Sequence, residues 1–502
     1  MYACFVDFSK AFDSLPRAIL FKKLIHYGIT GKFLNIILNL YENDKTRIKM
    51  NYKMSQEIHV QKGVRQGCVL SPLLFNIFMA DLPSQLKPEN SVSCNEHDKL
   101  NSIIWADDIL ILSDSVEGLN LKLETLNLYC HENVLKINTE KTKCMTFNKT
   151  GRIIRRNFFL GDTKLENVRS YKYLGLVFTP SGELKTALDD LRSRALKAYM
   201  CLKHKMGILF YTYVEETIKL FDTIIKPILT YSSDFWECLK LPKRNPIENL
   251  HIMFCKNLLG VQRNTTNIGV LLELGRTPLT IIAQKQAIKN WDRIRNSKAN
   301  QLIKSSYKAA EAVSLNWFTS IKMCLAENGF LHLSNETAPI YTRNIDVKVY
   351  NRLIDIFHQN SFESINNEDS KLRTYSIIKK RVGIEPYLKE ICNPQLRFEL
   401  SKFRLSNHKL MIEVGRHNNI PRTNRFCPFC QETVEDEIHF LTTCKQYTPL
   451  RSTILRKCRD IKPNFPYYTN QQKFIFIMTC PLLTYDLAKF VSNATKLREL
   501  QK

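Results

Sequence analysis

Two apolar runs flank a pair of adjacent carboxylates in the segment 102–113. Ile103 and Ile104 precede Asp107 and Asp108, and the apolar run 109–112 follows them. Apolar, β-prone runs on both sides of a short polar break predict a hairpin with the two aspartates at its turn. Strands anchored in a core would hold the two like charges together, and a bound cation is the usual reason for such an arrangement.

A third carboxylate has a similar context near the start of the chain, where the β-prone run 2–6 ends at Asp7. If this run neighbours the hairpin in one sheet, three carboxylates converge on a site that suits two Mg²⁺ ions and phosphoryl transfer. The other aspartate pair, Asp189-Asp190, lies in an amphipathic helix pattern. A solvent-exposed helix face explains that second pair without any chemistry.

The rest of residues 1–180 mixes helical and strand patterns, which is typical of an α+β domain. Ser71 and Pro72 favour a helix start, with Ser71 as the N-cap and Pro72 at the first helical position. We expect helices near 17–27, 31–43, 71–82 and 115–133, strands near 46–50, 57–60 and 143–147, and a hairpin near 157–178.

The cluster of turn formers at 179–182 ends this pattern, and the chain then becomes helical. The polar stretch 359–374 predicts a linker, and a small C-terminal unit is expected from about residue 395. We therefore expect the chain to consist of four parts, at 1–180, 181–300, 301–394 and 395–502. Helices are expected in the later parts at 183–206, 210–225, 245–260, 278–298, 300–313 and 346–358.

The chain of 502 residues carries a net charge of +25, from 73 basic and 48 acidic residues spread along its length. Long basic surfaces favour a polyanionic partner, first of all nucleic acid. A membrane surface is the alternative, but no basic amphipathic helix stands out, and no stretch approaches 18 uninterrupted apolar residues. Most of the 15 cysteines are isolated, which fits a reducing compartment and an intracellular protein, nuclear or cytoplasmic or both.

One cysteine cluster near the C-terminus differs from the isolated ones. Cys427, Cys430, His439 and Cys444 have the spacing C-x2-C-x8-H-x4-C, and three thiolates with one imidazole suit tetrahedral Zn²⁺. A redox CxxC motif is the alternative, but it would need neither His439 nor Cys444. The basic segment 402–425 before the cluster suits phosphate contacts, although a solvated linker would have the same composition.

Five motifs in order along the chain carry a family resemblance. The chain resembles the reverse transcriptases of non-LTR (LINE-type) retrotransposons, strongly over 1–180, weakly beyond, and again at the C-terminal cysteines. The resemblance implies a right-hand polymerase palm, a helical thumb or linker region and a C-terminal CCHC zinc unit. The motifs are Asp7-Phe8-Ser9-Lys10-Ala11-Phe12-Asp13, the run Arg65–Asn76, Ala106-Asp107-Asp108, Leu135–Thr142 and Tyr173-Leu174-Gly175.

The resemblance implies RNA-directed DNA synthesis from dNTPs, on an RNA template and a DNA primer or target, with two Mg²⁺ ions and one Zn²⁺ ion. Asp7 and Asp107 resemble the metal-bridging acids, and Asp108 resembles a supporting ligand. Phe12 matches the ring that excludes a 2′-hydroxyl, although a plain core aromatic would also fit. Asp13 is expected to be structural.

The remaining matches imply contacts with the substrates. Arg65, Gln66 and Gly67 resemble the loop against the template and the nascent pair, where Gly67 allows close backbone approach. Lys141 matches a basic residue near the triphosphate, with a solvated lysine as the alternative. The primer-grip hairpin is matched by Tyr173, Leu174 and Gly175.

Fingers and an endonuclease region usually precede these motifs in the family, and neither lies within the 502 residues. We therefore expect an N-terminally truncated fragment that binds RNA and DNA in a salt-sensitive way but synthesises little cDNA until the upstream region is restored. The alternative function is a catalytically inactive, nucleic-acid-binding remnant of such an element. The sequence alone does not indicate an oligomeric state.

Overall fold

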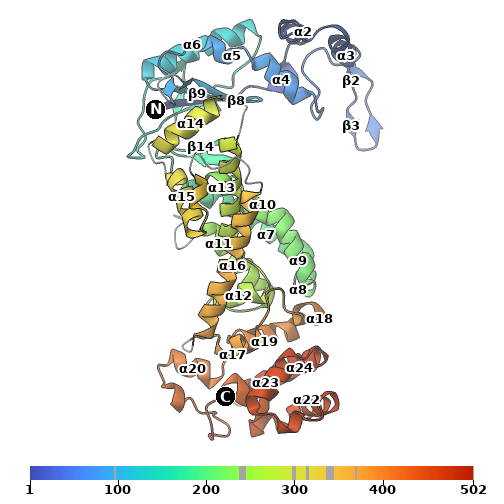
Figure 1. Ribbon diagram of the computed structural model, residues 1–502. Helices are drawn as coiled ribbons and strands as arrows, with labels where there is room; N and C mark the ends of the chain where they lie inside the picture. The colour runs from blue at the N-terminus through green and yellow to red at the C-terminus, as the bar shows by residue number, and fades with distance from the viewer. Residues whose placement is uncertain are drawn as a thin grey trace. The chain divides into compact units, whose positions relative to one another are not determined.

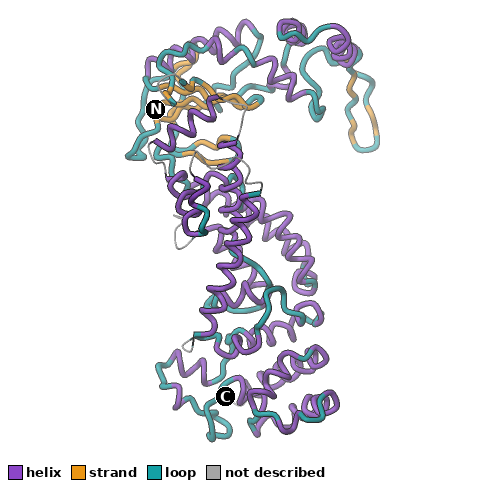
Figure 2. The backbone as a smooth tube through the Cα atoms, viewed as in Figure 1, coloured by secondary structure: helices purple, strands orange, loops and turns teal. Residues whose placement is uncertain are grey.

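The computed structural model describes residues 1–94, 98–236, 245–296, 301–312, 316–334, 344–367 and 370–500. Two compact units make up the chain, one of Met1–Ala187 with Ser297–Leu315, the other of Leu188–Asn296 with Asn316–Lys502. All strands among the described residues belong to the first unit, and the second unit is built from helices (Figures 1 and 2). The functional division expected at 180, 300 and 394 stays a prediction.

A five-stranded sheet forms the centre of the first unit, in the order β13-β10-β1-β9-β8. Strand β1 (Tyr2–Val6) lies in the middle and pairs antiparallel with both β9 (Asp108–Ser113) and β10 (Lys143–Thr146). Strand β8 (Ser102–Trp105) pairs antiparallel with β9, and β13 (Glu166–Asn167) pairs parallel with β10. The expected hairpin and the N-terminal strand are therefore neighbours in one sheet.

The two faces of this sheet are covered by different elements. Cys4 and Val6 of β1 join the large core with helices α2 (Arg17–His26), α4 (Ser71–Met79) and α6 (Val116–Glu132). Phe5 of β1 points to the opposite face, because successive strand side chains alternate. There it packs with the hairpin of β14 (Tyr171–Tyr173) and β15 (Leu176–Phe178).

A two-stranded ribbon, residues 45–59, leaves the first unit between α3 (Gly31–Glu42) and α4 and projects away from α2 and α3 (Figure 1). Its strands are β2 (Lys45–Thr46), β3 (Lys49–Met50), β4 (Lys53–Met54) and β5 (Ile58–His59). The other elements of the unit are α1 (Ala11–Ser14), α5 (Leu82–Gln85), β6 (Val92–Ser93), β7 (Lys99–Leu100), β11 (Phe159–Leu160), β12 (Thr163–Lys164) and α14 (Gln301–Ala312).

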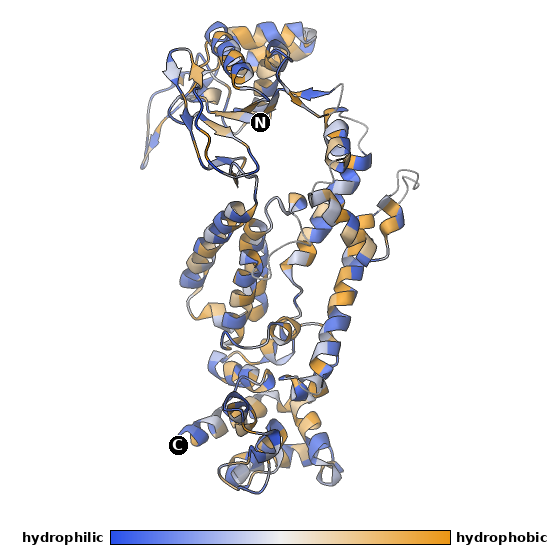
Figure 3. Cartoon of the chain, turned by 90° about the vertical axis from the view of Figure 1, so that its left-hand side faces the viewer, coloured by the Kyte–Doolittle hydropathy of each residue, from blue (hydrophilic) through white to orange (hydrophobic). Residues whose placement is uncertain are grey.

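The second unit is a series of packed helices, and Figure 3 shows hydrophobic and hydrophilic residues side by side along most of them, as expected for amphipathic helices. Its helices are α7 (Lys185–Met206, which begins in the first unit), α8 (Leu209–Thr212), α9 (Val214–Leu220), α10 (Lys226–Leu229), α11 (Pro246–Leu259), α12 (Asn267–Glu273), α13 (Leu279–Asn296), α15 (Asn316–Glu327), α16 (Ile345–Asn366), α17 (Arg373–Ile378), α18 (Tyr387–Glu390), α19 (Pro394–Arg404), α20 (Met411–His417), α21 (Glu437–Thr442), α22 (Thr448–Ile461), α23 (Asn470–Thr479) and α24 (Thr484–Leu500).

Three local expectations are wrong. The polar stretch 359–374 is no linker, because α16 continues to Asn366 with Ser361 and Ile365 buried. Instead of one helix at 210–225, a break at Tyr213 and a π-helical turn at Phe221–Ile225 divide the segment. Ser71 is not an N-cap, because Leu70 holds that position and the Ser71 hydroxyl donates to the Arg65 carbonyl at 2.5 Å. Local polarity had suggested the linker, but the buried side chains of Ser361 and Ile365 belong to a continuous helix.

Among the described residues, no single helix is long and apolar enough to cross a membrane. Two consecutive segments, Asn470–Thr479 and Pro481–Leu500, are together long and apolar enough to span a membrane by length and composition. Their axes, however, bend by 83° at the break between them.

Candidate active site and candidate metal centre

Three carboxylates are positioned by two neighbouring strands of the sheet. Val6 pairs with Ile109 in the β1–β9 register, so Asp7 at the end of β1 lies beside the start of β9. The turn between β8 and β9 consists of Ala106 and Asp107, with Ala106 at φ 54°, while Asp108 is already the first residue of β9 and pairs with Trp105. The expected hairpin is confirmed, with only Asp107 of the pair in its turn.

The electrostatics of Asp108 indicate that the charges of the other two carboxylates reach it. Burial, and then the negative charges of Asp107 and Asp7, raise the pKa of Asp108. Lys141 Nζ lies 4.0 Å from Asp7 Oδ2, but its side chain is 70% exposed, so this ion pair is weak. Carboxylates at neighbouring strand ends are oxygen ligands of the kind that divalent cations prefer.

Sequence reasoning missed Tyr171 at this site, and it placed Thr142 in the motif Leu135–Thr142 without a role. Tyr171 stacks on Phe5 with ring centroids 4.4 Å apart, and burial followed by the charges of Asp7 and Asp108 raises the pKa of Tyr171 to about 12. Thr142 Oγ1 accepts a hydrogen bond of 3.2 Å from the Asp7 amide. Tyr171 lies two residues before Tyr173 in an alternating strand, and that spacing was the available signal.

The hairpin β14–β15 presents the predicted primer-grip residues next to the carboxylates. Burial, and then the charge of Asp108, raise the pKa of Tyr173 to about 12, which places its ring within the field of the site. Tyr173 is 7% exposed, whereas Leu174 is 39% exposed at the turn. Leu174 and Gly175 both have positive φ, 45° and 81°, as a type I′ hairpin turn requires.

Phe12 and the loop 63–67 are held together by backbone bonds. The Val64 amide donates to the Phe12 carbonyl at 2.8 Å, and the Gly63 amide donates to Leu15 at 2.8 Å. A Cβ on Gly63 would lie 2.6 Å from the Asp13 carbonyl oxygen, so the close approach of this loop to Asp13 depends on Gly63. The Phe12 ring stacks on Phe75 at 4.9 Å and remains partly exposed.

In the loop after Gly63, Arg65 is held by hydrogen bonds, whereas Gln66 and Gly67 are exposed. The Arg65 guanidinium donates to Asp44 Oδ1 at 2.9 Å and to the Leu40 carbonyl at 2.8 Å. Gln66 is exposed, and Gly67, at φ 86°, has nothing within 4 Å of its built Cβ position. The loop therefore presents open backbone at Gly67 while Arg65 anchors it.

The four C-terminal metal-ligand candidates converge in the second unit. Their ligand atoms all lie within 4.8 Å of one another. Cys427 Sγ and Cys444 Sγ are 3.8 Å apart, and Cys430 Sγ and His439 Nε2 are 3.5 Å apart. Ligands at about 2.3 Å (sulfur) and 2.0 Å (nitrogen) from one tetrahedral ion would have edges of about these lengths. The cluster can therefore hold a metal ion.

The other ring nitrogen of His439 faces away from the cluster. His439 Nδ1 lies 2.9 Å from Thr433 Oγ1 and 3.0 Å from Thr443 Oγ1, and such a contact fixes the ring of a metal-bound histidine. Helix α21, which carries His439, starts at the N-cap Asp436, whose carboxylate accepts from the His439 amide at 2.8 Å. Both interactions set the direction of Nε2.

A model of the reverse transcriptase (RNA-dependent DNA polymerase) family matches residues 1–178. These residues are a reverse transcriptase domain. The match spans the three carboxylates, the loop 63–67 and the hairpin β14–β15, so the family resemblance drawn from the motifs is confirmed.

Relatives of the reverse transcriptase domain come from retrotransposable elements. The chain is 30% identical over 200 residues to the Pol polyprotein of the type-2 retrotransposable element R2DM of Drosophila melanogaster, covering 37% of this chain and 18% of the relative. An R2 Pol polyprotein of Popillia japonica is 26% identical over 308 residues, which cover 58% of this chain and 50% of the relative. The RNA-directed DNA polymerase from mobile element jockey of Drosophila funebris is 25% identical over 270 residues, 51% of this chain and 28% of that protein. The chain thus spans half or less of the length of these relatives.

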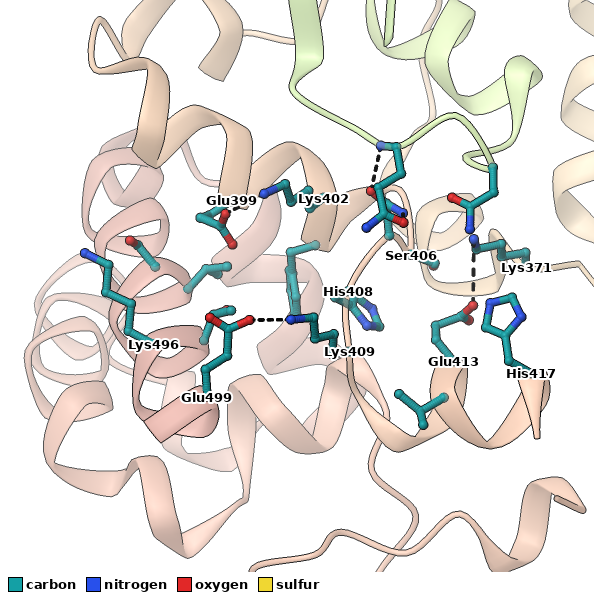
Figure 4. A pocket seen from close by; sticks show the side chains of 18 of the residues that line it. Lys371, Glu399, Lys402, Ser406, His408, Lys409, Glu413, His417, Lys496 and Glu499 are labelled. Atoms are coloured by element: carbon teal, nitrogen blue, oxygen red, sulfur yellow. Dashed lines mark hydrogen bonds and ion pairs between the residues drawn. The ribbon is translucent and has the colours of Figure 1, made fainter. Parts of the chain in front are cut away.

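Outside the reverse transcriptase domain, a cavity of about 720 Å³ lies among α19, α20 and α24 of the second unit (Figure 4). Four lysines and three glutamates are among its lining residues. Three ion pairs bring these groups together, Lys371–Glu413 at 3.9 Å, Lys402–Glu399 at 2.8 Å and Lys409–Glu499 at 2.7 Å. The pairs cancel most of the charge, so this cavity is polar rather than strongly basic.

Proposed function

We propose that the chain is the polymerase part of a non-LTR retrotransposon protein that copies RNA into DNA. The reaction is nucleotidyl transfer from a dNTP to a primer 3′ end, with an RNA template and a DNA primer or target as partners. The observation that carries the proposal is the meeting of Asp7, Asp107 and Asp108 at neighbouring strand ends of a reverse transcriptase domain. Such a protein would work inside the cell, in the nucleus, the cytoplasm or both.

In this mechanism the carboxylates of Asp7, Asp107 and Asp108 would hold the catalytic cations. Two Mg²⁺ ions bound there would activate the primer 3′-hydroxyl and neutralise the charge of the leaving pyrophosphate. Lys141, 4.0 Å from Asp7, would reach the triphosphate, and the open backbone at Gly67 would lie against the nascent base pair. The hairpin at Tyr173 and Leu174 would support the primer strand, and the helices after Lys185 would form a thumb.

The test is extension of a DNA primer on an RNA template by the 502-residue chain, and in parallel by the chain with any in-frame upstream sequence of its gene. Extension that requires dNTPs and Mg²⁺ supports the proposal. Salt-sensitive binding of the primed template without extension in either form would favour the alternative, a nucleic-acid-binding remnant.

Phe12 gives a prediction about sugar selection. A ring at this position would collide with a 2′-hydroxyl, so Phe12→Ala should lower the preference for dNTPs over rNTPs by at least about tenfold. The measurement is the ratio of kcat/KM for the two nucleotide types. Phe75→Leu is the matched control, because Phe75 is the buried stacking partner of Phe12 and its change should cost stability but leave the ratio unchanged. An unaltered ratio in Phe12→Ala would make Phe12 a plain core aromatic.

We also propose that the C-terminal cluster binds one structural Zn²⁺ ion. Purified protein should contain about one zinc per chain, and Cys427→Ser or Cys444→Ser should lose it, because a structural site needs all four ligands. Metal analysis by mass spectrometry is the measurement. Cys201→Ser, which changes an exposed cysteine on α7, should keep the zinc. Full zinc retention by Cys427→Ser would refute this assignment.

A further inference from the structure

The ribbon 45–59 has an exposed surface that its own fold does not use. Every residue from Lys45 to His59 is exposed. Ile48 is 61% exposed, Met50 75% and Tyr52 fully, although these are large apolar side chains. An isolated two-stranded ribbon is marginally stable in water, and clustered exposed apolar side chains usually mark an interaction site.

The register of the ribbon separates its side chains into two faces. Lys45 pairs with His59 and Lys49 with Met54, and the Arg47 guanidinium contacts Glu57 at 2.7 Å. These residues form a mainly basic face, because strand side chains alternate. The opposite face carries the pairs Thr46–Ile58 and Met50–Lys53, with Ile48 between them, and is mainly apolar.

The base of the ribbon is fixed to the active-site loop. Asp44, 7% exposed, directly precedes the ribbon, and its carboxylate binds Arg17 at 2.6 Å and Arg65 at 2.9 Å. The Arg17 guanidinium also donates to Val60 at 2.5 Å and to Gly63 at 2.9 Å, on the other side of the ribbon. Both ends of the ribbon are therefore tied to the loop 63–67 beside Phe12.

We propose that the ribbon 45–59 binds a nucleic-acid duplex next to the active site, and more specifically the RNA–DNA duplex of template and primer. The inference rests on the proposed function for the identity of the duplex. The ribbon carries four cations, Lys45, Arg47 and Lys49 on the basic face and Lys53 at the edge of the apolar face, against one acid, Glu57, so it complements a phosphate backbone. A-form duplexes have a wide, shallow minor groove, where the apolar face would lie against sugars while the cations reach phosphates.

The same charges argue against a second copy of the chain as the occupant. A symmetric dimer brings the same patch of both copies together, and here it would bring the ribbon cations of one copy against those of the other. Like charges facing each other across an interface are unfavourable, whereas duplex binding releases counterions.

The first experiment measures affinity for a labelled RNA–DNA duplex across a salt series. The double variant Lys49→Gln, Lys53→Gln should bind about tenfold more weakly near physiological salt, and its slope of log affinity against log salt should be shallower by about two. The matched control Lys22→Gln, Lys149→Gln removes two exposed lysines from α2 and from the loop after β10 and should keep the affinity within about twofold. Circular dichroism checks that the variants fold.

A second readout does not depend on charge. Met50 and Met54 are 75% and 59% exposed, so peroxide should oxidise both readily, and the duplex should slow their oxidation severalfold. Met323 on α15, 45% exposed, is the internal reference.

The results of these experiments distinguish an error in the ribbon proposal from an error in the polymerase proposal. Wild-type affinity and salt slope in the double variant, with unprotected Met50 and Met54, would overturn the proposal. The proposal would also be overturned if analytical ultracentrifugation showed that the wild-type protein is a dimer and that the double variant is a monomer. If the ribbon variants weaken duplex binding but no primer extension is found, the duplex-binding ribbon stands and the polymerase proposal fails.

Discussion

Asp107→Ala is expected to abolish primer extension, with a loss of about 10³-fold or more, which corresponds to at least about 4 kcal/mol of transition-state stabilisation. The reason is position. Asp107 lies in the two-residue turn of β8–β9, where its charge acts on Asp108, and Asp7 ends the neighbouring strand. Phosphoryl transfer depends mainly on positioning and charge neutralisation, so the loss of one metal-binding carboxylate cannot be compensated elsewhere.

The measurement is single-turnover extension of a primed RNA template, on whichever form of the chain shows activity. Asp189→Ala is the matched control, because it removes an exposed aspartate from the other Asp-Asp pair, on helix α7, and should leave extension unchanged. Duplex affinity measured without Mg²⁺ should be similar in both variants. Undiminished extension by Asp107→Ala would disprove the assignment of the carboxylates.

Glu437→Gln is expected to destabilise the second unit by about 3 kcal/mol, because it removes the buried negative charge that Arg373 contacts and leaves that arginine only its longer contact with Glu413, at 3.3 Å. Glu437 is fully buried, and its carboxylate contacts Arg373 Nη2 at 2.7 Å, His408 Nε2 at 3.0 Å and the Ser406 hydroxyl at 3.1 Å. The measurement is the melting temperature together with hydrogen exchange of α20 and α21. Glu432→Gln, at an exposed pair with Lys445, should change stability by less than about 0.5 kcal/mol.

The same carboxylate predicts a pH dependence. Burial alone would raise the pKa of Glu437, but the hydrogen bond and charge of His408, and the charge of Arg373, lower it to about 2. A folded-state pKa below the unfolded value gives stability that is present above about pH 4.5 and lost as the pH falls towards 2. Wild-type stability should therefore fall more steeply than that of Glu437→Gln between pH 5 and pH 2. Identical acid unfolding of the two proteins would contradict this role.

The sequence was most informative where the signal is local. The run 2–6 and the runs around Asp107 are short, apolar and β-prone, and the structure confirms both as strands. The zinc spacing is also local, since its four residues lie within 18 positions, and their ligand atoms do converge. That β1 neighbours β9 rather than another strand came from the family resemblance, because pairing partners do not appear in the hydrophobic pattern.

Partners far apart in the sequence could not be predicted. In the sequence, Asp44 looks like an ordinary polar loop residue. Only the fold shows that it binds both Arg17, 27 residues away, and Arg65, 21 residues away. Glu437 and Arg373 are 64 residues apart. The stretch 359–374 had predicted a linker because it is mostly polar, yet α16 continues to Asn366 and Ile365 is buried.

The position of helix α14 in the chain affects how the first unit is synthesised and how it can be expressed separately. It belongs to the first unit although more than 100 residues of the second unit precede it in the chain, and its Ser305 and Ser306 hydroxyls contact Asp98 and Cys94 beside β6 and β7. A ribosome must therefore translate past residue 312 before the first unit can be completed. An expression fragment cut at the family boundary, residue 178, would omit one of its own parts, and a minimal catalytic fragment should carry α14 on a short engineered connection.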